Sequence, residues 1–126
     1  MHRSRFGVLT LDCDDINAGV SFWSQALGAK PVWRDDPADP YVSFREVVDG
    51  LTLLLQRVPE PKSAKLRLHI DIETDDLAAE VARLWKLGAR RQIEEWWVME
   101  DPCGNEFCVV PWQSESFSER ANTWTA

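Results

Sequence analysis

The sequence has few of the residues that build disulfide scaffolds, metal clusters or membrane spans. Only three of its 126 residues are cysteines and two are histidines. The cysteines are odd in number and the nearest pair is spaced C-x4-C, which is typical of neither a disulfide framework nor a zinc ribbon. No apolar run is long enough for a signal peptide or a membrane span. We therefore expect reduced thiols, a cytoplasmic location and no membrane partner.

Positive charge is also scarce. Fourteen basic residues face 21 acidic ones, for a formal net charge of −7. This field repels phosphate groups, so nucleic acid is not an expected partner. The length and the 44% hydrophobic content are sufficient for one folded domain with its own core.

One stretch, residues 66–89, carries the clearest pattern. Residues 66–73 alternate strictly, which predicts a strand with four aliphatic residues on one face and His69 with polar neighbours on the other. Residues 77–87 have helical spacing, with Asp75 or Asp76 as candidate N-cap and Gly88 at the C-terminal end. We predict that His69 points into a cleft, because the aliphatic face of its strand must cover a helix.

The same order of elements is predicted in the first half of the chain. Asp14, Asp15 and Ile16 correspond to Asp75, Asp76 and Leu77, and Gly28 corresponds to Gly88. The predicted strands are 6–12, 30–34, 41–47 and 51–58 in the first half, and 66–73, 91–94, 96–100 and 106–110 in the second, with helices over 16–27 and 77–87. Two small βαβββ sheets bury a face by joining, so the pattern predicts an α+β fold with one eight-stranded, pseudo-symmetric curved sheet. The predicted single domain is 1–112, with modules 5–58 and 66–111, a linker 59–65 and a C-terminal tail 113–126.

Three segments carry a resemblance to a known family: FWSQALGA at 22–29, LHIDIETDDLAAEV at 68–81 and MEDPCGNEFCVV at 99–110. With the βαβββ duplication, they resemble the vicinal-oxygen-chelate superfamily, and within it the glyoxalase-like domains grouped with bleomycin-resistance proteins and extradiol dioxygenases. The resemblance implies a concave small-molecule site. It does not select an activity, because that superfamily contains metal-dependent lyases, isomerases and dioxygenases as well as metal-free proteins that sequester drugs.

The resemblance also implies metal ligands on the first, fourth, fifth and eighth strands. These positions fall on Val8, Leu54, His69 and Cys108. Val8 and Leu54 have no donor atom, so no metal or other cofactor is expected. Zinc or another divalent ion remains an alternative, with His69, Cys108 and Glu106 as its candidate ligands.

The other residues of the predicted site each allow two interpretations. Gln56 either contacts a ligand or makes a cross-strand hydrogen bond, and Cys108 is either a reactive thiol or a core residue. Trp96 and Trp97 are adjacent, so they point to opposite faces of a strand and one of them is expected to line the cleft.

Two functions follow from these residues. The first is metal-free binding or sequestration of an aromatic or cationic compound. The second is a lyase, isomerase or dioxygenase with His69 and Glu106 as catalytic residues. A homodimer is expected in either case, because the predicted sheets leave edge strands.

Overall fold

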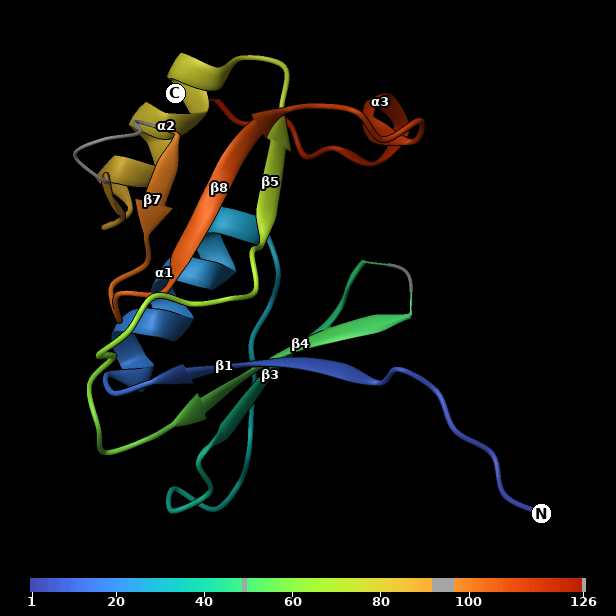
Figure 1. Cartoon of the computed structure of the whole chain (residues 1–126), viewed down its shortest axis with the longest axis vertical. Coiled ribbons are helices and arrows are strands. Elements are labelled where there is room, and N and C mark those ends of the chain that lie inside the picture. Colours follow the sequence, from blue (N-terminus) through green and yellow to red (C-terminus); the bar gives the residue numbers. More distant parts are fainter. Residues whose placement is uncertain (49, 92–96, 126) are drawn as a thin grey trace. The chain divides into compact units, whose positions relative to one another are not determined.

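The computed structural model of the chain describes residues 1–48, 50–91 and 97–125 (Figure 1). They fall into two compact units, Met1–Lys62 and Ser63–Ala126. The boundary lies within the predicted linker. No helix in these described ranges is long and apolar enough to cross a membrane.

The first unit is a βαβββ module. Its elements are β1 (Val8–Cys13), α1 (Ile16–Leu27), β2 (Val32–Trp33), β3 (Tyr41–Val48) and β4 (Leu51–Arg57). The strand order in the sheet is β1-β4-β3-β2, with β1 parallel to β4 and the other pairs antiparallel.

The second unit repeats this order. Its elements are β5 (Asp71–Thr74), α2 (Leu77–Lys86), β6 (Arg90–Arg91), β7 (Val98–Glu100) and β8 (Glu106–Pro111), followed by the short helix α3 (Phe117–Arg120). The strand order is β5-β8-β7-β6, again with one parallel pair, in which β5 and β8 lie side by side (Figure 1). The α+β class and the duplicated βαβββ module are therefore confirmed. In the described residues, however, the strands form two four-stranded sheets and not one continuous eight-stranded sheet.

The register of the parallel pairs shows how close the duplication is. Thr10 and Asp71 both lie five residues before a capping aspartate, and Leu54 and Cys108 both lie four residues after a turn glycine. Thr10 pairs with Leu54, and Asp71 pairs with Cys108. The two sheets are therefore in the same register, and positions in one unit can be compared directly with positions in the other.

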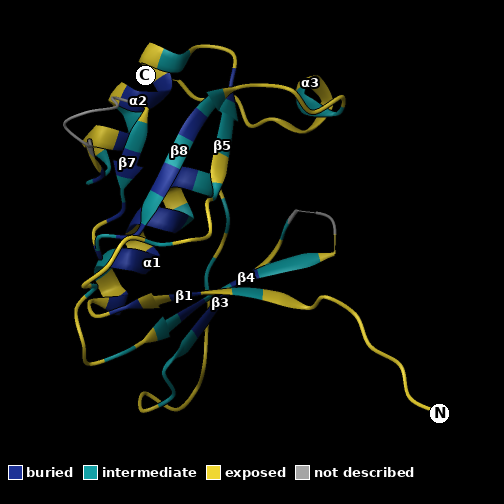
Figure 2. Ribbon diagram, viewed as in Figure 1, coloured by how far each residue is buried: buried dark blue, intermediate teal, exposed yellow. Residues whose placement is uncertain are grey.

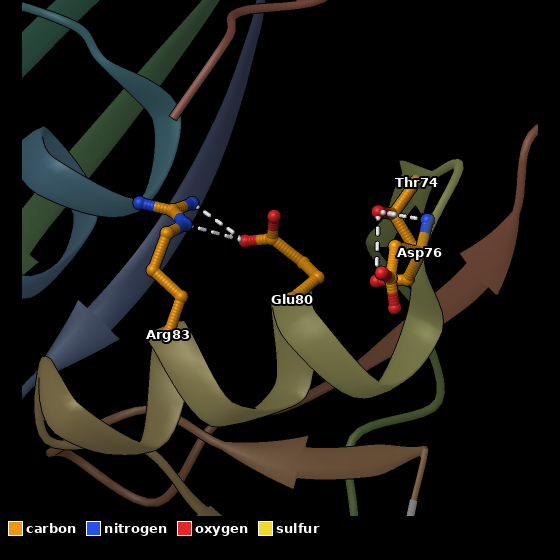
Figure 3. A network of polar contacts seen from close by, with 4 residues as sticks. All are labelled: Thr74, Asp76, Glu80 and Arg83. Atoms are coloured by element: carbon orange, nitrogen blue, oxygen red, sulfur yellow. Dashed lines mark hydrogen bonds and ion pairs between the residues drawn. The ribbon is translucent and has the colours of Figure 1, made fainter. Parts of the chain in front are cut away.

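Both long helices are capped as the sequence predicts. The Asp15 carboxylate accepts a hydrogen bond from the Ala18 N–H at 3.1 Å, and that of Asp76 accepts one from the Ala79 N–H at 3.0 Å. Gly28 ends α1 with a φ of 63°, a left-handed conformation that glycine adopts without a Cβ clash. Thr74 also holds the start of α2, because its hydroxyl accepts from the Asp76 N–H at 3.1 Å (Figure 3).

Buried and more exposed residues alternate along the strands of each sheet (Figure 2), so each sheet buries one face. In the first unit this face includes Leu53, Leu55 and Phe44, and α1 contributes Phe22 and Trp23 to the core. Gly19 marks the contact of α1 with the sheet, because a Cβ built there would lie 2.8 Å from Cys13 Sγ. In the second unit, Met99, Phe107 and Val109 are buried on the sheet and Val81 and Leu84 on α2.

One predicted strand is shorter than its pattern. The alternation of residues 66–73 predicts a strand over that whole range, but β5 covers only Asp71–Thr74. A hydrogen bond from the Cys108 N–H to the Ile70 carbonyl, at 2.9 Å, carries the pairing just beyond β5. Residues 92–94, predicted as strand, lie outside the described residues.

Candidate functional site

Each sheet has a helix-free face, which we define as the face opposite its buried residues. Side chains alternate along a strand, so the residues between the core positions point to this face. On the first sheet, the helix-free face comprises Val8, Thr10, Asp12, Thr52, Leu54 and Gln56, together with Ser43, which pairs with Leu54 but is buried. On the second sheet it comprises Asp71, Glu73, Val98, Glu100, Glu106, Cys108 and Val110.

The structure brings three predicted site residues together on the first sheet. Val8 pairs with Thr52, Thr10 pairs with Leu54, and Asp12 pairs with Gln56 in successive rows. Val8 is 51% exposed, and Leu54 and Gln56 are half-buried. This face therefore combines carbon surface at Val8 and Leu54 with hydroxyl and amide groups that can donate and accept hydrogen bonds.

The second sheet places Cys108 and Glu106 on its helix-free face. Cys108 is half-buried and lies beside the exposed Asp71 of β5. This face is richer in carboxylates than that of the first sheet. Because Cys108 is partly buried, its role as a reactive thiol or as a structural residue stays a prediction.

Two of these carboxylates are already engaged by backbone groups. Glu106 Oε2 accepts a hydrogen bond from the Leu66 N–H at 2.9 Å. Glu73 Oε2 accepts from the N–H groups of Gln113 and Ser114 at 3.1 and 3.2 Å. A further hydrogen bond from the Ser114 side chain is the largest influence that lowers the pKa of Glu73 below its ordinary value. The sequence pattern did not indicate either contact, because the partners are far apart along the chain.

His69 lies outside the strand on which the alternation placed it. It is exposed, within residues 66–70, and precedes β5 by two residues. Its predicted position on the face of a strand is therefore wrong, and its orientation into a cleft stays a prediction. The physical reason is that Leu66 bonds to a side chain and the regular pairing stops near Ile70.

The two adjacent tryptophans divide between described and undescribed residues. Trp97 is 39% exposed in a turn just before β7, and its carbonyl accepts from the Val109 N–H at 2.9 Å. Trp96 lies outside the described residues. Which of the two lines a ligand site stays a prediction.

The donor set for a metal ion is incomplete at the positions that the resemblance assigns. Val8 and Leu54 supply carbon at two of these four positions. Glu106, a further candidate ligand, accepts a hydrogen bond from the Leu66 N–H through its carboxylate. Within the part of the chain that the structure describes, no group of three or more histidine, cysteine or acidic side chains is arranged to hold a metal ion.

Comparisons with known proteins agree with this fold. A model of the glyoxalase-like domain matches residues 8–110. No curated protein sequence matches the chain at a significant level.

Solved structures share the fold at low sequence identity. The genomically encoded fosfomycin resistance protein FosX from Listeria monocytogenes has a TM-score of 0.66 and 15% identity, covering 95% of this chain and 99% of that one. The trypanothione-dependent glyoxalase I of Leishmania major has a TM-score of 0.61 and 20% identity, covering 94% and 93%. TnmS3, an antibiotic binding protein from a Streptomyces species, has a TM-score of 0.56 and 20% identity, covering 89% and 99%. Because the family model matches residues 8–110, the chain belongs to the family of glyoxalase-like domains, in the vicinal-oxygen-chelate superfamily.

Proposed function

We propose that this glyoxalase-like domain binds or sequesters a small aromatic or cationic molecule without a metal ion. The observation that carries the proposal is the pair Val8 and Leu54. Both occupy positions that the resemblance assigns to metal ligands, both lie on the helix-free face of the first sheet, and neither has a donor atom.

The chemistry of this face favours a ligand with apolar surface. Covering carbon surface contributes about 25 cal/mol for each Å² removed from water. Thr10, Thr52 and Gln56 supply hydrogen bonds that can orient a polar edge of the same ligand. A small anion gains little from valine and leucine, and the net charge of −7 repels it.

Two of the similar proteins support a small organic molecule as the ligand. FosX is a fosfomycin resistance protein and TnmS3 is an antibiotic binding protein. A protein that protects by sequestering an antibiotic needs a site for a small organic molecule but no catalytic machinery. We infer a small organic ligand for this chain, and its aromatic or cationic character rests on Val8 and Leu54 and not on these proteins.

The proposal is tested by calorimetric titration with a planar aromatic cation, ethidium, and with a small anion, lactate, as the matched opposite. We expect saturable ethidium binding and no lactate binding. Leu54→Lys should weaken ethidium binding by about tenfold, because the ammonium group repels the cation and the apolar contact of the leucine is lost. Thr123→Ala, in the C-terminal tail, is the control. Binding of lactate alone, or no effect of Leu54→Lys on ethidium, would refute the proposal.

A metal-dependent or histidine-based lyase, isomerase or dioxygenase is the alternative function. Asp71 and Cys108 are neighbours on β5 and β8, and His69 lies two residues before Asp71, so one region carries oxygen, sulfur and nitrogen donors. Elemental analysis of protein made in zinc-supplemented medium separates the two functions. We expect substoichiometric zinc; one zinc per chain that disappears in His69→Ala would support the enzyme instead.

We also propose that the chain forms a homodimer. The edge strand β2 of the first sheet carries Val32 and Trp33, which are 37% and 50% exposed. Exposed apolar side chains of this kind are suited to burial against a second copy of the chain. Sedimentation equilibrium checks this directly, since a species of 14.5 kDa at working concentration would contradict it.

A further inference from the structure

We propose that Glu106 is a positioning residue, which fixes the segment that carries His69 through a hydrogen bond to the backbone and not through its charge. This assigns Glu106 a different role from that of a catalytic base or metal ligand. The proposal concerns the segment itself and does not rest on the function proposed above.

Two hydrogen bonds attach the segment 66–70 to the strand β8. Glu106 is the first residue of β8, and its Oε2 accepts from the Leu66 N–H, 40 residues earlier, at 2.9 Å. Two residues further along β8, the Cys108 N–H donates to the Ile70 carbonyl at 2.9 Å. Residues 67–69 lie between these attachments, and all three are exposed.

The local sequence favours a different arrangement. The strict alternation of residues 66–73 is suited to a strand that continues β5 along β8. Extending the register by two residues from the Asp71 and Cys108 pair would place His69 beside Glu106, with Leu68 on the same face as Ile72. Instead, Leu68 is 55% exposed and β5 starts at Asp71. The carboxylate of Glu106 supplies the acceptor that the Leu66 N–H uses in this arrangement.

Substitutions can distinguish a role of Glu106 as a hydrogen-bond acceptor from a role that requires its negative charge. A backbone N–H needs only an oxygen acceptor, and a glutamine side chain offers a carbonyl oxygen at nearly the same place. A general base or a metal ligand needs the carboxylate itself. Glu106→Gln therefore retains a positioning role and abolishes a catalytic one, whereas Glu106→Ala abolishes both.

Amide hydrogen exchange of the ¹⁵N-labelled full chain, without ligand, is the test. The Leu66 amide should exchange about tenfold faster in Glu106→Ala than in the wild type, and within about threefold of the wild type in Glu106→Gln. The His69 ring resonances should move in Glu106→Ala only. Glu73→Ala is the matched control, because Glu73 holds Gln113 and Ser114 in the same way; it should release those amides and leave Leu66 protected.

An equal rise of the Leu66 exchange rate in Glu106→Gln and Glu106→Ala would overturn the positioning role. A Leu66 amide that is unprotected in the wild type would overturn it as well.

Discussion

The two units have different residues at an equivalent position near the start of their helices. Gly19 and Glu80 both lie four residues after the capping aspartate, and each N–H bonds to the carbonyl of that aspartate at 3.0 Å. In the first unit, α1 comes so near the sheet that a Cβ at Gly19 would meet Cys13 Sγ. In the second unit the equivalent residue is a glutamate, 7% exposed, whose carboxylate is paired with Arg83 at 2.6 Å (Figure 3).

The difference extends from the helices to their surroundings. α1 has neither acidic residues in its first turn nor basic residues in its last, whereas α2 has Glu80 in its first turn and Arg83 and Lys86 in its last. Arg83 also lies over the ring of Trp124, 3.8 Å from its centroid, and so connects α2 to the C-terminal tail. The two units thus retain the same topology and register, while the helix position changes from close contact with the sheet at Gly19 to a partly buried ion pair at Glu80.

Substitutions in the two cores should have the largest effects on the free energy of unfolding. They test whether both units depend equally on buried apolar side chains. Phe44 and Phe107 are 0% and 1% exposed. Phe44→Ala and Phe107→Ala should each lower the free energy of unfolding by about 3–5 kcal/mol, the usual cost of a large core truncation. Urea unfolding followed by circular dichroism measures both. A cost below about 1 kcal/mol for either would show that its unit does not depend on that core.

Removing the ion pair should have the next largest effect. Arg83→Ala leaves the Glu80 carboxylate without its partner at a site where little water reaches it, so we expect a loss of about 2 kcal/mol. Arg83→Ala combined with Glu80→Leu should recover most of that loss, because the combination removes both the charge and its partner. Urea unfolding of the single and double variants gives the coupling energy. An additive result would mean that the pair contributes nothing specific to the second unit.

Gly19→Ala should have a smaller effect, because two contributions oppose each other. The new Cβ overlaps Cys13 Sγ, at a cost of about 2 kcal/mol, and alanine favours the helix by about 1 kcal/mol over glycine. The expected net loss of stability is about 1 kcal/mol. Cys13→Ala combined with Gly19→Ala should remove the overlap and be more stable than Gly19→Ala alone. Thermal unfolding checks the order of the variants, and equal melting temperatures for Gly19→Ala and the wild type would contradict the close contact.

The smallest effect concerns the helix-free face of the second sheet. The Ser114 side chain and two backbone N–H groups hold the pKa of Glu73 below its ordinary 4.5, so this interaction stabilises the fold above that pH and is lost as the pH falls through the lowered pKa. Ser114→Ala should raise the pKa of Glu73 toward 4.5. Titration of the Glu73 side chain by NMR measures the change. Ser116→Ala is the control, because Ser116 makes no side-chain cap bond in α3; an equal shift there would exclude a specific role for Ser114.

The parts of the fold that depend on local chemistry were predictable from the sequence. Asp15 and Asp76 cap their helices, and Gly28 and Gly88 end them, because these preferences act within one turn of the chain. The duplication was visible from the same residues. Their spacing placed Leu54 and Cys108 at equivalent positions, as the register of both sheets confirms.

The candidate site was less predictable, because its geometry depends on contacts between distant segments. The alternation around His69 is a local signal, and the hydrogen bond from Leu66 to Glu106 spans 40 residues that no periodicity connects. The attachment of Ser114 to Glu73 is equally remote, since the partners are 41 positions apart in the chain. A hydrogen bond between a side chain and a distant backbone group, such as that of Glu106 with Leu66, accompanies a shorter strand without any change in the pattern of hydrophobic residues.

The parallel pairing of each module's first strand with its last has a consequence for the order of folding. β3 with β4, and β7 with β8, are sequential antiparallel pairs that close over short loops, whereas β1 and β5 must wait for strands that lie beyond a helix. Loop-closure entropy favours the sequential pairs as the earliest structure. During synthesis, the ribosome releases every strand of the first sheet before any of the second. We therefore expect the nascent chain to complete one half as a folding intermediate while the other half is still being made.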